Sequence, residues 1–75
     1  MNNLEGAILI SGKSYKYFLI VGKKKLKHGL NGGKIKKLII SHNETILAQY
    51  NEKWVIKPEI KEAQMALYIL MLENN

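Results

Sequence analysis

Residues 4–21 have the sequence LEGAILISGKSYKYFLIV, in which two apolar runs flank a short segment that contains Gly12. Runs rich in β-branched and aromatic residues are typical of β-strands, and a short glycine-containing connection between two of them is typical of a hairpin. We therefore predict antiparallel strands over residues 4–10 and 14–21. This hairpin commits the first part of the chain to a β-sheet.

The rest of the chain predicts three further elements of sheet and one helix. Residues 34–41 and 45–50 are predicted to form a second pair of apolar strands joined by a turn. Residues 54–56 are predicted to form a short fifth strand or an extended segment that leads into the helix. Pro58 suits the first helical position, and helical periodicity continues to residue 73. The sequence predicts a single α+β domain over residues 1–75: an antiparallel sheet of four to five strands packed on one face by a C-terminal helix over residues 58–73.

Alternation along the strands predicts which side chains share a face of the sheet. On the second strand, one face carries Tyr15, Tyr17, Leu19 and Val21, and the other carries Lys16, Phe18 and Ile20. On the third strand, strict alternation places Ile35 and Ile39 on one face, and Leu38 and Ile40 on the other.

The predicted helix has two apolar faces. The stripe expected to cover the sheet consists of Ile60, Ala63, Leu67, Leu70 and Met71. A second face, in the last two turns, consists of Met65, Tyr68, Ile69 and Leu72. An isolated domain would leave this second face in water, so we expect it to form the interface of a homo-oligomer or to bind a partner. Alternatively, a loop or a sheet edge of the same domain covers it.

The charge of the chain is strongly polarised. Residues 6–43 contain nine lysines and no acidic residue, whereas the rest contains three lysines and six glutamates, and the formal net charge is +6. A basic surface attracts anionic partners, and lysine recognises phosphate as a point charge without directional specificity. Two alternatives do not involve binding. An AT-rich genome favours lysine codons, which would explain part of the charge, and a run of lysines often forms only a solvated loop.

Several residues are candidates for binding an anion. Glycines in Gly29-Leu30-Asn31-Gly32-Gly33-Lys34 could turn backbone amides toward one anion, although the same residues also predict an ordinary flexible loop. The candidate anion-binding residues are Lys23, Lys24, Lys25, Lys27, Gly32, Gly33, Lys34, Lys36 and Lys37. Aromatic residues that could stack on bases are Tyr15, Tyr17, Tyr50 and Trp54, of which we expect at least two to be buried in the core.

Other classes of site find little support. Gly12-Lys13-Ser14 resembles the end of a phosphate-binding P-loop, but the required earlier glycine and following helix are not in place. With no Asp, no Cys and only two His, the sequence offers no convincing catalytic or metal site, and we expect a non-enzymatic protein without cofactors. The first residues do not resemble a signal peptide and no apolar run is long enough to span a bilayer, so we expect a soluble, cytoplasmic protein with no membrane partner.

One pattern resembles a known family. Gly29-Leu30-Asn31-Gly32-Gly33-Lys34-Ile35-Lys36-Lys37-Leu38 is followed by Tyr50, Trp54, Pro58 and a terminal helix. This arrangement is similar to an uncharacterised family of small phage and prophage proteins from low-GC bacteria. In that family a Gly-Ile-Asn-Gly-Gly-basic-Ile-Ser-Lys-Leu segment precedes a Tyr-Asp-Arg-Gly-Trp segment. This chain departs from the pattern at Lys36 and at Asn51-Glu52-Lys53. The resemblance implies a phage accessory protein that acts in the host cytoplasm, with inhibition of a host defence system as one role.

The sequence thus leaves three functional hypotheses. The first is a binding protein for nucleic acid or a nucleotide, which uses the lysine-rich region. The second is an inhibitor that binds an acidic host protein, with lysines for steering and an apolar patch for affinity. The third is a structural subunit that only assembles with itself.

Overall fold

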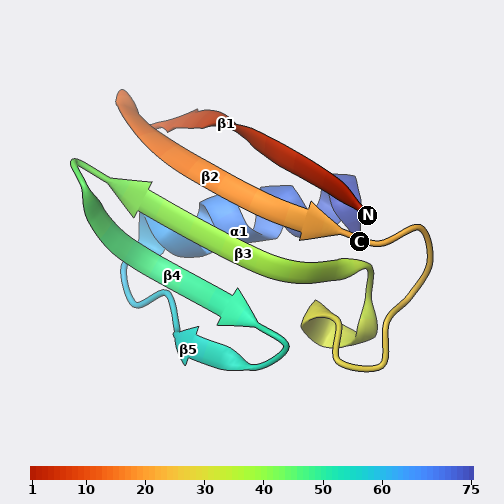
Figure 1. Ribbon diagram of the computed structural model, residues 1–75. Helices are drawn as coiled ribbons and strands as arrows, with labels where there is room; N and C mark the ends of the chain where they lie inside the picture. The colour runs from red at the N-terminus through yellow and green to blue at the C-terminus, as the bar shows by residue number, and fades with distance from the viewer.

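The computed structural model describes residues 1–75 and has two layers, a five-stranded antiparallel sheet and one helix (Figure 1). The strands follow one another across the sheet in chain order. Their bounds are β1 Asn2–Ile10, β2 Lys13–Val21, β3 Ile35–His42, β4 Thr45–Asn51 and β5 Trp54–Ile56, and the helix α1 spans Lys61–Asn74. The predicted α+β fold is confirmed, with five strands in the sheet.

Two tight turns set the register of the two long hairpins. Ser11 and Gly12 both have positive φ, at 52° and 75°, and join Ile10 directly to its partner Lys13. Asn43 and Glu44, at 48° and 65°, do the same between β3 and β4. Two-residue turns with positive φ at both positions match the right-handed twist of the strands that they connect. Glycine adopts this conformation freely, but Glu44 adopts it at a steric cost.

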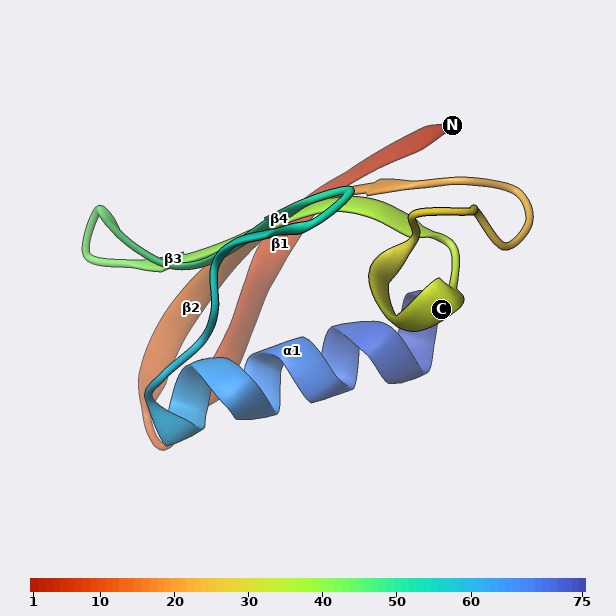
Figure 2. The same ribbon diagram turned by 90° about the horizontal axis from the view of Figure 1, so that it is seen from below.

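The helix covers only one face of the sheet, and the other face is open (Figure 2). Between the layers lies an apolar core in which no polar or charged residue is buried. Ala63, Ala66 and Leu70 of α1 are buried against the sheet. The small side chains of Ala63 and Ala66 let the helix lie close to the strands. The sheet side chains that are completely buried include Leu19, Ile35, Leu38 and Ile40.

A β-bulge at the start of β3 changes which side chains face the core. Val21 pairs with Ile35 but Ile20 pairs with Lys37, so Lys36 is an extra residue on β3. An extra residue shifts the alternation by one position. Ile35 is therefore buried together with Leu38 and Ile40, whereas Ile39 is half-buried on the open face. The predicted grouping of Ile35 with Ile39 was wrong for this reason.

The helix begins later than predicted. Its first residue is Lys61, and the extended Ile60 precedes it as the N-terminal cap. Residues 57–60 descend from β5 to the layer below the sheet (Figure 2). The Gln64 side chain donates a hydrogen bond to the Pro58 carbonyl across this connection, at 3.2 Å. Pro58 therefore belongs to the linker, and Ile60, which we expected to cover the sheet, is 44% exposed.

Candidate nucleic-acid interface

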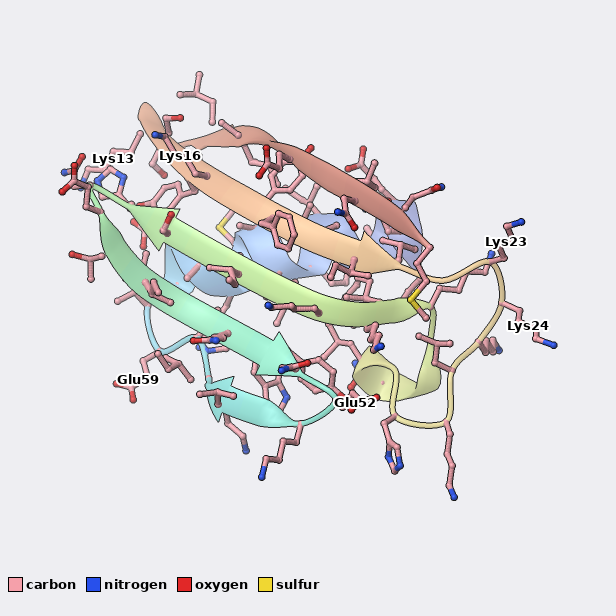
Figure 3. The ribbon with its side chains drawn as sticks, in the orientation of Figure 1. Lys13, Lys16, Lys23, Lys24, Glu52 and Glu59 are labelled. Atoms are coloured by element: carbon pink, nitrogen blue, oxygen red, sulfur yellow. The ribbon has the colours of Figure 1, made fainter.

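Most of the candidate lysines lie at one end of the molecule. Residues 22–34 connect the end of β2 to the start of β3 and include a short 3-10 helix, η1, at Leu30–Gly32. Lys23 and Lys24 project into solvent from this connection, which we call the basic loop (Figure 3). Lys13 and Lys16 lie at the opposite end of the sheet (Figure 3). The nine lysines of residues 6–43 therefore form two groups rather than one continuous patch.

The basic loop is held to the rest of the protein by hydrogen bonds. The Gly22 amide donates to the Lys34 carbonyl at 2.9 Å, and the Leu26 amide donates to the Gly33 carbonyl at 3.0 Å. The Tyr50 hydroxyl donates to the His28 carbonyl at 2.9 Å. Although the glycines predicted a flexible connection, these contacts give the loop a defined path. The exposed lysine side chains are thus presented from an ordered backbone.

Two backbone N–H groups at the end of the glycine-rich segment point toward the same place, and the side chain of Asn75 accepts a hydrogen bond from each. The backbone N–H groups of Lys34 and Ile35 each donate to Asn75 Oδ1 at 3.0 Å. Asn75 Nδ2 in turn donates to the Leu30 carbonyl at 2.8 Å. The side chain of Asn75 therefore occupies the place where an anion would bind to such amides. We call this set of three hydrogen bonds the Asn75 latch.

The glycines make room for these close approaches. A Cβ atom on Gly33 would overlap the Asn75 side chain, and one on Gly29 would overlap the Gly33 carbonyl. Gly32 has a φ of +71° and open space around it, so its role is conformational. Gly32 and Gly33 therefore shape the loop. The site that results is occupied by the C-terminal end of α1 and not by an anion.

The start of β3 extends the basic loop onto the sheet. Lys34, Lys36 and Lys37 are half-buried, and Lys37 pairs with Ile20 on the open face. Glu52 lies close to this end, in the turn between β4 and β5, and its amide donates to the Lys36 carbonyl at 3.2 Å (Figure 3). Seven lysines thus lie in the basic loop or at the adjoining start of β3, and the carboxylate of Glu52 lies at the margin of this group. Those seven are Lys23, Lys24, Lys25, Lys27, Lys34, Lys36 and Lys37.

The four aromatic candidates for base stacking lie on the helix side of the sheet. Tyr15 and Tyr50 are buried, which confirms that at least two of the four belong to the core. Tyr15 stacks on His42 with ring centroids 4.8 Å apart, and Tyr50 meets Trp54 edge to face at 5.2 Å. Tyr17 and Trp54 are half-buried beside the core. The aromatic residue on the open face is Phe18, which alternation predicts there but which is not among the four candidates.

The second apolar face of the helix is largely exposed. Met65, Tyr68 and Leu72 are 43%, 62% and 68% exposed, whereas Ile69 packs against the core. Met71, on the other flank of α1, accepts a hydrogen bond at 3.9 Å from Asn31 in η1. At 100° per residue, this exposed stripe lies opposite the buried Ala63, Ala66 and Leu70, so it faces away from the sheet. No segment of this chain covers it.

The surface has two shallow depressions, and neither is at the basic loop. One, of about 290 Å³, lies at the open face and is lined by Glu5, Gly6, Lys16, Tyr17, Phe18, Ile39 and Ser41. The other, of about 230 Å³, lies near the start of the helix. No group of three or more His, Asp or Glu side chains is arranged to hold a metal ion. No helix is both long and apolar enough to cross a bilayer.

The fold and the lysine distribution define a small α+β protein with one strongly basic end. The chain belongs to the family described as a domain of unknown function (DUF7678), which matches residues 2–75. This agrees with the expected membership of an uncharacterised family. No curated protein and no solved structure matches the chain.

Proposed function

We propose that this protein is a non-enzymatic nucleic-acid-binding protein whose basic loop contacts the phosphate backbone. One observation carries the proposal: seven lysines gather around a loop that hydrogen bonds hold in place, with the carboxylate of Glu52 only at the margin (Figure 3). An ordered loop loses less conformational entropy on binding than a mobile one. Lysine ammonium groups without directional preference suit a phosphate backbone, which repeats the same charge along its length.

The shape of the basic end favours a polymer over a single nucleotide. Small ligands bind in concave sites that bury most of their surface. Four of the lysines are instead exposed on the basic loop, and neither depression is lined by that loop. The amides that could have formed a compact phosphate site already donate to Asn75. A free nucleotide would therefore make few contacts, whereas a nucleic acid could span several lysines.

The resemblance to small phage and prophage proteins supplies a biological setting for this proposal. A phage-encoded binder of this size would act in the cytoplasm of the host cell. Sequestering a nucleic acid there would be one way to counteract a host defence system. The binding activity can be tested independently of this setting.

Charge reversal at two matched sets of lysines tests the proposal. Replacing Lys23 and Lys24 with Glu should sharply weaken binding of labelled oligonucleotides, measured by fluorescence anisotropy. The control replaces Lys57 and Lys61, which are also exposed but lie away from the basic loop. Both double variants lower the formal net charge from +6 by four, so a difference between them reports position rather than total charge.

Salt provides a second readout, for which Lys23 and Lys24 are replaced by the neutral Gln so that binding remains measurable. Each phosphate neutralised on a single strand contributes about −0.7 to the slope of log K against log salt. Removing two such contacts should make the slope shallower by about 1.4. The proposal would be wrong if the wild type failed to bind at low salt, or if both charge-reversal variants lost affinity equally.

A second candidate function is protein interaction through the exposed stripe of α1. Exposed apolar patches on a small protein usually mark an interface, and Met65, Tyr68 and Leu72 lie together on the side of α1 that faces away from the sheet. The occupant would be a second copy of this chain or an acidic host protein. The basic loop would also attract an acidic protein partner. In this second function, however, most of the affinity would come from the exposed stripe of α1, whereas in nucleic-acid binding it would come from the basic loop.

A further inference from the structure

The open face of the sheet has a regular arrangement of side chains. The strand registers align Glu5, Phe18, Ile39 and Gln49 in one row across β1 to β4. In the next row toward the basic loop, Ile20 pairs with Lys37. On the other side of Phe18, Lys16 pairs with Ser41. The middle of this face is therefore apolar, with one lysine at each end.

This arrangement is not explained by packing within the chain. The helix lies on the opposite face, and Phe18, Ile20 and Ile39 remain half-buried at the surface (Figure 2). Phe18 lines the larger depression together with Lys16 and Ile39. Phe18 is only half-buried and no other element lies over the open face (Figure 2), so a planar ring has room to lie against its phenyl ring.

The same face connects the two separated groups of lysines. Lys13 and Lys16 lie at one end of the sheet, and the basic loop lies at the other (Figure 3). Lys37 lies between Phe18 and the basic loop, because it pairs with Ile20 two residues beyond Phe18 on β2. At about 3.3 Å per residue, the path from Lys16 to Ile20 is about 13 Å long. A polyanion laid along β2 would meet lysines at both ends and an aromatic ring between them.

We infer that the open face is a binding surface for single-stranded nucleic acid, on which Phe18 stacks against a base while Lys16 and Lys37 contact the flanking phosphates. This inference rests on the proposed function and names its substrate class. Single strands expose their bases for stacking, whereas a duplex keeps them paired inside. Glu5, adjacent to Phe18 in the same row, opposes the phosphates and keeps the affinity of this surface moderate.

Replacement of Phe18 by leucine tests the inference, because it keeps an apolar side chain and removes the aromatic ring. Stacking contributes about 1–3 kcal/mol per base, so affinity for a single-stranded oligonucleotide should fall roughly 5- to 150-fold. Phe18→Trp should retain the affinity. Tyr68→Leu is the matched control, since Tyr68 is an exposed aromatic residue on α1, on the other side of the sheet. Thermal unfolding of each variant checks that the fold is intact.

Fluorescence gives an independent readout of stacking. In the Phe18→Trp variant, an unlabelled single strand should quench the new tryptophan. Wild-type Trp54 lies against Tyr50 on the helix side and should not respond. An unchanged affinity of Phe18→Leu, or tighter binding to duplex than to single strands, would overturn the inference while leaving the basic loop as the site. Failure of the wild type to bind any oligonucleotide would overturn both this inference and the proposed function. If self-association of the protein then perturbed the amide resonances of the open face, that face would be a protein-binding surface.

Discussion

Single residues in this protein carry conformations that their side chains do not favour. Glu44 has a φ of 65° in the turn between β3 and β4, where a glycine would have no steric conflict. A residue with a Cβ atom is less stable there by about 1–2 kcal/mol. The sheet tolerates Glu44 because the turn joins two long strands whose register is fixed on both sides by apolar pairs.

Glu44→Gly should therefore stabilise the protein, although glycine also makes the unfolded chain more flexible. We expect a net gain of about 0.5–1 kcal/mol in the free energy of unfolding, and a higher Tm. Thermal or urea unfolding measures it. Glu44→Ala serves as the control, because it removes the same charge but keeps the Cβ atom. If the alanine variant gained as much stability as the glycine variant, charge rather than backbone strain would be the cause.

At the scale of elements, the Asn75 latch joins the end of α1 to the basic loop. Its three hydrogen bonds link residues that lie 40 or more positions apart in the chain. It satisfies two backbone amides and one carbonyl that the glycine-rich loop would otherwise leave with fewer partners. The path of the loop, and so the direction of its lysines, depends on where the helix ends.

Asn75→Ala should loosen the loop without disrupting the sheet. Each lost hydrogen bond is worth about 1 kcal/mol, and the amides of Lys34 and Ile35 should exchange hydrogen faster. The amide of Leu38, further along β3, should keep its protection. Asn74→Ala is the control, because the Asn74 side chain donates only to Leu70 within the helix. Equal protection of Lys34 in wild type and Asn75→Ala would show that the latch does not hold the loop.

The elements also show where sequence reasoning is sufficient and where it is not. Local patterns predicted four strands and the helix, and left residues 54–56 open as a strand or an extended lead, because alternation, turn residues and helical periodicity are short-range signals. They could not predict the bulge at Lys36, which depends on pairing with β2 and reverses the faces of Ile35 and Ile39. The Asn75 latch was missed for the same reason, because it joins distant parts of the chain. Alternation placed Phe18 on the correct face of the sheet. It could not predict that the helix covers the opposite face and leaves Phe18 accessible to a ligand.

At the scale of the whole molecule, two features favour self-association. The outer edge of β1 is a nine-residue strand with no Pro and no bulge in its pairing with β2, and Glu5 is its one charged side chain. Natural proteins usually protect an edge of this length with more charges, a proline or a bulge. The exposed stripe of α1 is a second surface, on the side of the helix that faces away from the sheet. A twofold axis between two copies would pack the stripes against each other and remove both from water.

Leu72→Lys tests this assembly. Leu72 is 68% exposed in the isolated chain, so a lysine there should leave the monomer folded but place two like charges close together across the twofold axis. We expect the wild type to be dimeric at micromolar concentration by light scattering and the variant to be monomeric. Val55→Lys is the matched control, because Val55 is an exposed apolar residue on β5 and not on α1. A monomeric wild type would instead leave the stripe for another protein.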